Sequence, residues 1–281
     1  MTIYLKNREI NFFKICSHFE HEKISGLVSC AKINKKLFNQ LSQSVKEYVD
    51  KSRLYKFENK TPNGLLVPKK EIEKEFNDVL ISYRDVLLSL NFDKIISLWT
   101  IPVVRIKDPE IDDENKNRVM RSELPHSDTW VGWNKKSILV NIPILGDTDK
   151  NKVQFYQHPT SFNESWVEKQ ISFEEGAKKF AKLCKPIKSD YKKGYAYIAD
   201  ISVIHQTHRS IGSSERISLE IPLFTQLPNK NEFGANDTID HKTIMSLNKE
   251  YEIKFSLKMH ERVGQSGISR PVKFFISKIN A

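Results

Sequence analysis

Five short segments between residues 95 and 224 constrain the fold of this chain most strongly. They are IISLWTIPVVRIKD (95–108), SILVNIPIL (137–145), KVQFYQH (152–158), GYAYIADISVIH (194–205) and RISLEIPLF (216–224). Short runs of branched and aromatic residues separated by turn residues predict β-strands. A Rossmann arrangement is disfavoured, because no Gly-rich strand-to-helix turn occurs among only ten glycines.

Helices are predicted ahead of these strands, over residues 22–57 and 69–98. In the first of them Leu37, Leu41, Val45 and Val49 recur every four residues and leave one apolar stripe. A shorter helix is predicted over 172–184, with Ser172 as its N-cap. Residues 107–123 are polar and predict a loop or lid, and residues after 225 predict a polar tail of helix or coil.

The order of these elements predicts an α+β protein with a mainly β core. Helices gathered on one side of an antiparallel β-sandwich are the natural packing for it. We expect a single domain over residues 1–281. Its parts are a helical N-terminal support (1–98), a catalytic core (99–224) and a C-terminal extension (225–281).

The charge and the cysteines limit the partners that we expect. The formal net charge is +10, but most of the excess is lysine scattered along the whole chain, which is typical of a solvated surface. Nucleic-acid binding is therefore unlikely, and an anionic small substrate is at least as plausible. The three cysteines are far apart, so neither a disulfide framework nor a zinc cluster is indicated. No signal peptide or membrane span is evident, and we expect a soluble cytoplasmic protein.

The stretch ELPHSDTWVGW (123–133) places a histidine and an aspartate two residues apart. Residues at this spacing project from the same face of a β-strand. If His126 and Asp128 lie on a strand, their side chains aim at one point. The pair could then be a salt bridge, a surface accident or two ligands of a metal.

A third donor and a cation follow downstream. His205 lies 77 residues after Asp128, at the end of a predicted strand, and Arg216 follows eleven residues later. Two imidazoles and a carboxylate suit an Fe(II) facial triad with open positions, and zinc accepts the same donors. The guanidinium of Arg216 suits a dicarboxylate co-substrate, and Ser218 and Glu220 share its strand face.

These residues carry a resemblance to a known family. HSD, a later His and then RIS resemble the His-x-Asp…His…Arg-x-Ser pattern of the Fe(II)/2-oxoglutarate-dependent dioxygenases, which have a double-stranded β-helix (jelly-roll) core. The segment 192–220 is similar to the phytanoyl-CoA hydroxylase-like branch and to oxygenases of aminoglycoside and carbohydrate biosynthesis clusters. The acidic residue that often follows the glycine in that family is missing from GYAYIAD. The resemblance covers about residues 100–224.

The resemblance implies a reaction and a set of roles. His126, Asp128 and His205 would hold Fe(II), while Arg216 and Ser218 would bind the distal carboxylate of 2-oxoglutarate. Asn141 is positioned as related enzymes place a polar group for the same co-substrate. With O2, such an enzyme hydroxylates or otherwise oxidises a C–H bond of a small polar metabolite, a class that includes sugar-derived molecules.

Several alternatives remain open at this point. His208 could replace His205 as the ligand, and Trp130 and Trp133 could line the substrate pocket or belong to the core. Arg105, Arg118 and Arg121 could meet an anionic substrate or be solvated charges. The same fold could also serve a metalloenzyme without redox chemistry, such as an isomerase or hydrolase, or an oxygenase acting on nucleic acid. The sequence predicts no oligomeric state.

Overall fold

The fold combines helices with antiparallel sheets. The structure, a computed structural model, describes residues 1–54, 60–61, 63–66, 68–96, 98–100, 102–109, 121–131, 135–226, 238–240, 251–257 and 272–278. The α-helices in these ranges are α1 (Ile3–Cys16), α2 (Lys35–Leu54), α3 (Glu73–Ser89) and α4 (Phe173–Lys179). The 3-10 helices are η1 (Lys70–Ile72), η2 (Phe92–Lys94), η4 (Asp128–Val131), η5 (Glu164–Val167) and η6 (Ala181–Leu183).

The described strands form three sheets in which all pairings are antiparallel. The first seven are β1 (Glu22–Lys23), β2 (Val28–Lys32), β3 (Leu98–Thr100), β4 (Val103–Lys107), β5 (Ser137–Gly146), β6 (Asn151–Gln157) and β7 (Lys185–Pro186). The others are β8 (Tyr195–Asp200), β9 (His205–Arg209), β10 (Arg216–Phe224), β11 (Thr238–Asp240), β12 (Tyr251–Leu257) and β13 (Val272–Lys278).

The main sheet has the order β1-β2-β8-β5-β10-β3-β11, and β4 pairs with β10 next to β3. The minor sheet has the order β7-β6-β9, and His126 extends it through an isolated bridge to His205 on β9. β12 and β13 pair as a separate hairpin. The strands that carry the predicted site residues are therefore divided between two sheets.

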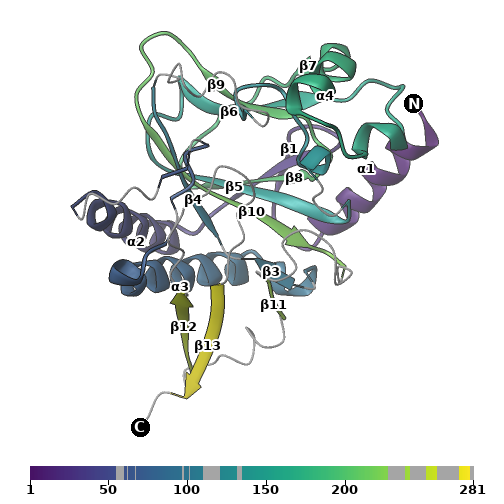
Figure 1. Ribbon diagram of the computed structural model, residues 1–281. Helices are drawn as coiled ribbons and strands as arrows, with labels where there is room; N and C mark the ends of the chain where they lie inside the picture. The colour runs from purple at the N-terminus through teal and green to yellow at the C-terminus, as the bar shows by residue number, and fades with distance from the viewer. Residues whose placement is uncertain are drawn as a thin grey trace.

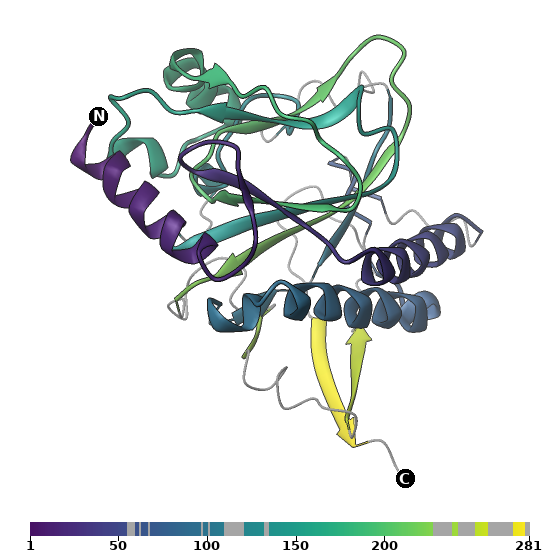
Figure 2. The same cartoon turned by 180° about the vertical axis from the view of Figure 1, so that it is seen from behind.

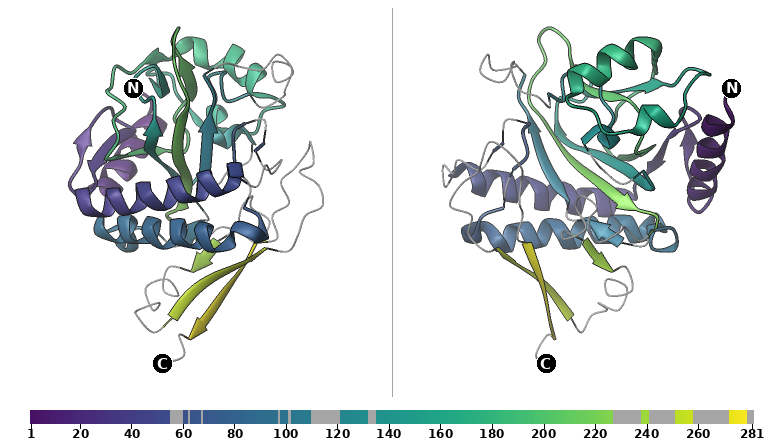
Figure 3. Two further views of the ribbon diagram at one scale, coloured as in Figure 1. Left: turned by 90° about the vertical axis from the view of Figure 1, so that its left-hand side faces the viewer. Right: turned by 45° about the vertical axis from the view of Figure 1, so that its right-hand side comes forward.

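The layers are visible in Figure 1. Helices α2 and α3 pack against each other along one side of the main sheet, and the minor sheet lies on the other side. Figure 2 shows α1 at the edge of the molecule opposite α2. In both views of Figure 3 the β12–β13 hairpin lies beyond α3, on the side away from the main sheet.

The central strand β5 is covered on both of its faces. Eight consecutive residues, Ser137 to Ile144, are buried, and such a continuous apolar run is typical of a strand between two layers. The register against β10 shifts between Ile217 and Ser218, where Pro143 faces Ser218. Proline cannot donate to the ladder, so an irregularity is favoured at this point.

The apolar repeats predicted α2 and α3 correctly, but the predicted helix over 22–57 is wrong at its start. Residues 28–32 form β2, which pairs with β8 at the edge of the main sheet. Helix α2 begins after Asn34, whose side-chain oxygen accepts from the backbone N–H of Lys36 at 2.9 Å. This cap separates the helix from the strand before it.

The predicted strand over 194–205 is in fact two strands in different sheets, β8 and β9. Between them the Asp200 carboxylate accepts hydrogen bonds from the backbone N–H and the hydroxyl of Ser202, and the N–H of Val203 bonds to the Asp200 carbonyl. Asp and Ser form such turns readily. His205 consequently begins β9 and does not end the preceding strand.

Two further regions differ from expectation. Helix α1 was not predicted, and its apolar residues do not form one stripe, since Ile3, Ile10 and Phe13 are exposed whereas Leu5 and Phe12 are buried. The C-terminal region was predicted as helix or coil, but its described parts are strands. The segments YEIKFSL and VKFFISK are rich in strand-forming residues and pair with each other.

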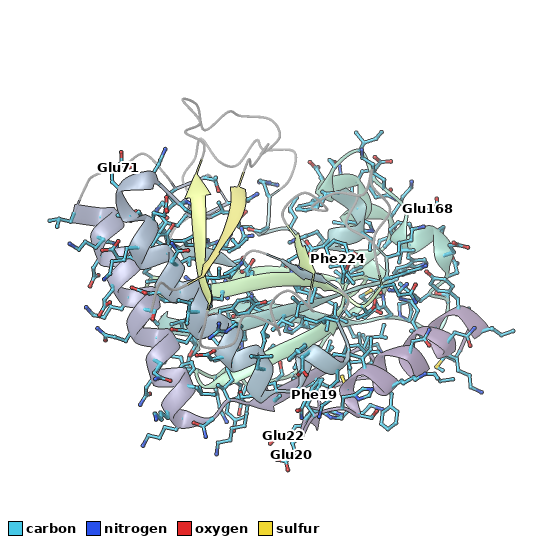
Figure 4. All side chains as sticks on the ribbon, turned by 90° about the horizontal axis from the view of Figure 1, so that it is seen from below. Phe19, Glu20, Glu22, Glu71, Glu168 and Phe224 are labelled. Atoms are coloured by element: carbon cyan, nitrogen blue, oxygen red, sulfur yellow. The ribbon has the colours of Figure 1, made fainter. Side chains whose placement is uncertain are left out.

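One continuous apolar core joins the helices to the main sheet, and it includes Phe76, Val140 and Leu219. Figure 4 shows the exposed carboxylates of Glu20, Glu22, Glu71 and Glu168 at the periphery, whereas Phe224 lies among the strands. In the part of the chain that the structure describes, no helix is both long and apolar enough to cross a bilayer.

Candidate metal centre and carboxylate site

Three side chains from separate parts of the chain converge on one point. His126, Asp128 and His205 each offer a ligand atom, and these atoms lie within 4.8 Å of one another. When the histidine, cysteine, aspartate and glutamate side chains of the described residues are compared, these three form the group whose geometry could hold a metal ion. His208 is not a member of the group, because it lies three residues along β9 and its ring approaches Ser210.

The local structure that joins His126 to Asp128 is different from the predicted strand. His126 makes a two-way backbone pair with His205, with N–H to carbonyl distances of 2.9 and 2.8 Å, but Asp128 is the first residue of 3-10 helix η4. The Ser127 hydroxyl accepts from the N–H of Thr129, which favours this turn. The two side chains therefore converge because the chain turns between them, and not through strand alternation.

The two imidazoles are oriented by the backbone. The Nδ1 of His126 lies 2.7 Å from the carbonyl of Leu124, and the Nδ1 of His205 lies 3.0 Å from that of Val203. A carbonyl only accepts, so each Nδ1 carries a proton, and in a neutral ring Nε2 is then the atom that presents a lone pair. Hydrogen bonds of this kind orient metal-binding histidines.

The distances and charges fit a cation between the three groups. The Nε2 atoms of His126 and His205 are each 4.0 Å from an oxygen of Asp128, too far for hydrogen bonds. Metal bonds of about 2.0–2.2 Å can bridge such a gap. Burial, with the nearby His205, lowers the pKa of His126 well below its ordinary value, so this imidazole is neutral as a ligand must be. Burial, together with Glu220, raises the pKa of Asp128, and a bound cation would counter this.

A turn far along the chain supports both ligand segments. The hydroxyl of Ser127, between the two candidate ligands of the HSD motif, donates to the carbonyl of Ile201 at 3.2 Å. On its other side the same turn is held by helix α1, because Arg8 donates twice to the Asp200 carboxylate, at 2.6 and 3.1 Å. Arg8 also reaches the carbonyl of Lys135. Helix α1 thus contributes to the placement of His205.

Aromatic rings shield the histidines from water. The ring of Phe173, at the start of α4, stacks on His126 with centroids 4.0 Å apart. Phe155 on β6 approaches His205 at 6.3 Å. Trp130 is core, since it is fully buried and its indole N–H donates to the carbonyl of Trp166. Its ring lies so close to Gly176 that a Cβ there would meet it at 2.4 Å.

Arg216 is the most unusual buried group in the described structure. Its side chain has 0% exposure, and none of its three guanidinium nitrogens has a hydrogen-bond partner among the described residues. Its nearest interactions are the ring of Tyr191, 5.4 Å from the guanidinium carbon, and a carboxylate oxygen of Glu220 at 4.0 Å. A buried cation without hydrogen bonds is costly, so the site is suited to an anion.

Strand alternation places further polar groups beside Arg216. Ser218 and Glu220 share its face of β10, and the partners of these residues on β4 and β5 share that face as well. The polar ones are Lys107 opposite Arg216, Arg105 opposite Ser218 and Asn141 opposite Glu220. Asn141 is buried and accepts a hydrogen bond from the hydroxyl of Tyr191, a residue that no sequence motif indicated.

Arg105 is an integral part of this face, and the expectation of a solvated charge is wrong for it. Its Nε lies 2.5 Å from Glu220, and its Nη1 donates to the carbonyl of Asn63 at 2.7 Å. Burial opposes ionisation of Glu220, but Arg105, Arg216 and Lys107 outweigh it, so its pKa is lowered and it is a carboxylate at neutral pH. Lys107 is buried too, and burial lowers its pKa well below the usual value.

Lys107 also fixes the segment that leads to His126. Its Nζ donates to the hydroxyl of Ser122 at 2.5 Å and lies 3.9 Å from Glu123. Arg121 lies within the described residues, but it belongs neither to the group of His126, Asp128 and His205 nor to the polar face around Arg216. Arg118, Trp133 and most of the predicted lid lie outside the described residues.

The chain was compared with family models, with curated proteins and with solved structures. No family model matches the chain, and no curated protein matches it. Similar solved structures are non-haem α-ketoglutarate-dependent enzymes of nogalamycin biosynthesis, the carbocyclase SnoK (9% identity, 79% of this chain and 86% of that chain, TM-score 0.43) and the epimerase SnoN (9%, 84% and 93%, 0.43). Another is an N-substituted L-amino acid dioxygenase from Burkholderia ambifaria (12%, 77% and 87%, 0.40).

Proposed function

We propose that the chain is a non-haem Fe(II)/2-oxoglutarate-dependent oxygenase. The observation that carries the proposal is the pairing of two unusual features, a two-histidine, one-carboxylate group and a fully buried arginine without hydrogen bonds. A metal site alone would fit many hydrolases or isomerases. The arginine adds a site for a carboxylate, which a co-substrate with two carboxylates requires.

In this proposal His126, Asp128 and His205 hold Fe(II), and Arg216 and Ser218 bind the distal carboxylate of 2-oxoglutarate. Both residues of that second pair are fully buried, so they would bind the carboxylate away from competing water. Asn141, held by the Tyr191 hydroxyl, supplies a further polar group. Together with O2, the bound iron and co-substrate supply an oxidant that can attack a C–H bond.

We further propose that the two sheets form a jelly roll over residues 99–224, within a single domain. From β4 to β10 the chain passes back and forth between the sheets, with β6 and β7 in succession in the minor sheet, which supports this. β4, β5, β8 and β10 are in the main sheet, whereas the His126 bridge, β6, β7 and β9 are in the minor sheet. Alternation of this kind is expected for a double-sheet roll.

The primary substrate that we propose is a small polar molecule, including sugar-derived ones. This class rests on the likeness of the segment 192–220 to oxygenases of aminoglycoside and carbohydrate biosynthesis clusters. The position of the substrate decides whether the reaction is hydroxylation or another oxidation.

An anaerobic titration tests the proposal. Apo-protein receives Fe(II) and then 2-oxoglutarate, and a visible charge-transfer band should appear only with both. His205→Ala should abolish the band, whereas His208→Ala, the matched control on the same strand, should keep it. Bound metal without a band would contradict the proposal and favour an isomerase or hydrolase. A band that survives in His205→Ala would refute the ligand assignment.

A further inference from the structure

Glu220 brings a negative charge to the place where the proposed co-substrate would put one. It lies on the same face of β10 as Arg216 and Ser218, two residues beyond the serine. The Ser218 hydroxyl donates to one carboxylate oxygen of Glu220 at 3.4 Å, and Arg216 is 4.0 Å from that same oxygen. The two groups proposed to bind the distal carboxylate of 2-oxoglutarate are thus already in contact with a carboxylate of the chain.

Arg105 holds the other oxygen of Glu220. Its Nε is 2.5 Å from Glu220 Oε2, whereas Arg216 and Ser218 approach Oε1. Glu220 is therefore shared between two sets of donors. The carboxylate lies closer to Arg105 than to Arg216, so it compensates the charge of Arg216 less than that of Arg105.

The exposed fractions of these side chains differ in the same sense. Arg216 and Ser218 have 0% exposure, but Arg105 and Glu220 are 18% and 19% exposed. Glu220 therefore lies between the deep donors and the accessible side of the cluster. A ligand carboxylate that reaches Arg216 must come close to Glu220, and the two like charges repel unless Arg105 neutralises the residue.

We propose that Glu220 competes with the co-substrate for Arg216 and Ser218, and that Arg105 limits this competition by holding Glu220 aside. Glu220 is then a residue that sets the affinity for a dicarboxylate, and Arg105 is a positioning residue that acts through it. The inference rests on the proposed function, because the ligand is the distal carboxylate of 2-oxoglutarate.

Glu220→Gln tests the competition directly. The dissociation constant of 2-oxoglutarate is measured anaerobically with Fe(II)-loaded protein, and the variant should bind roughly three- to tenfold more tightly, since the competing charge is gone. Tighter binding is a result that a merely structural role of Glu220 would not produce. Glu215→Gln is the matched control, because Glu215 is adjacent to Arg216 in sequence but its carboxylate pairs with Arg53. It should leave the dissociation constant unchanged.

A second ligand, 2-oxobutyrate, shows whether Glu220 acts on the distal carboxylate of the co-substrate or on its keto-acid end. 2-Oxobutyrate retains the keto acid but lacks the distal carboxylate, so Glu220→Gln should not change its affinity. Equal tightening of both ligands would place the action of Glu220 at the metal and overturn the inference. Unchanged or weaker 2-oxoglutarate binding by Glu220→Gln would overturn it as well.

Arg105→Gln tests the positioning role of Arg105, and it should change the affinity for 2-oxoglutarate in the direction opposite to Glu220→Gln. Without Arg105, the remaining partners of the Glu220 carboxylate within 4.0 Å among the described residues are Arg216 and Ser218, and 2-oxoglutarate should bind several-fold more weakly. In the Glu220→Gln background the same substitution should have a smaller effect. Equal effects in both backgrounds would show that Arg105 acts through its own charge. If the wild type with bound Fe(II) does not bind 2-oxoglutarate at all, the proposed function itself fails, which is a separate result.

Discussion

Strand β10 and the segments that carry the proposed ligands both contribute to the proposed site, but they position their side chains by different means. Arg216, Ser218 and Glu220 follow each other at spacing two on β10, whose register against β4 is unbroken, so backbone pairing aligns them. His126 and Asp128 lie on an isolated bridge and a 3-10 turn. Their placement depends on side chains that bond to the backbone.

The two regions differ in what holds the backbone that carries the site residues in place. A central strand tolerates even a buried cation such as Arg216, whose guanidinium has no hydrogen bond among the described residues, because many ladder hydrogen bonds maintain its backbone. The turn around Asp128 has few such bonds, and it relies on the hydroxyl of Ser127 and on the turn that Arg8 holds. We expect substitutions to separate function from stability on β10 and to affect both in the ligand segments.

The largest effect is expected from Asp128→Ala. It removes the one carboxylate of the proposed triad, and turnover should fall below about one-hundredth of wild type, beyond the loss typical of supporting groups. The fold should persist, since burial raises the pKa of this carboxyl and its removal relieves a buried charge. Iron content, turnover and the melting temperature check this. Substantial turnover with iron retained would show that Asp128 is not a ligand.

Arg216→Met should be the next largest and should separate binding from stability. The dissociation constant of 2-oxoglutarate should rise about 100-fold, as expected when charged hydrogen bonds are lost. The ligand-free protein should be at least as stable as wild type, because a buried cation without hydrogen bonds is replaced by an apolar chain.

Arg209→Met is the matched control for that experiment. Arg209 is also a largely buried cation, but its Nε donates to the carbonyl of Asp108 at 2.7 Å. Its replacement should destabilise the protein by about 1–3 kcal/mol in denaturant unfolding. If Arg216→Met destabilised the protein as much as Arg209→Met does, the view of Arg216 as a functional rather than structural group would be wrong.

Ser127→Ala should have the smallest effect of the three, and it should alter both properties together. Loss of its bonds to Thr129 and Ile201 should cost about 1–2 kcal/mol of unfolding free energy. Fe(II) affinity should fall about tenfold, since the turn that places Asp128 is loosened. Ser210→Ala, at an exposed hydroxyl, should change neither quantity. Unchanged iron affinity in Ser127→Ala would mean that the turn holds its shape without this support.

The regular parts of the fold were predictable from the sequence because their signals are periodic. The repeats of α2 and α3 and the branched segments of β5, β6 and β10 record burial on one or both faces. The start of the segment 22–57 was predicted wrongly as helix, because part of it forms strand β2, which is stabilised by pairing with β8. Pairing with a distant strand leaves little local trace.

The sequence by itself determined which residues could form the site, because His126, Asp128, His205, Arg216 and Ser218 occur in a recognisable order. It also determined that Arg216, Ser218 and Glu220 share a face, since strand alternation is a local property. Only the tertiary structure decided that the HSD motif is a bridge and a turn, that His205 rather than His208 faces the triad, and that Arg105 lies against Glu220. These facts depend on contacts between segments that are far apart in the chain, and no local preference encodes them.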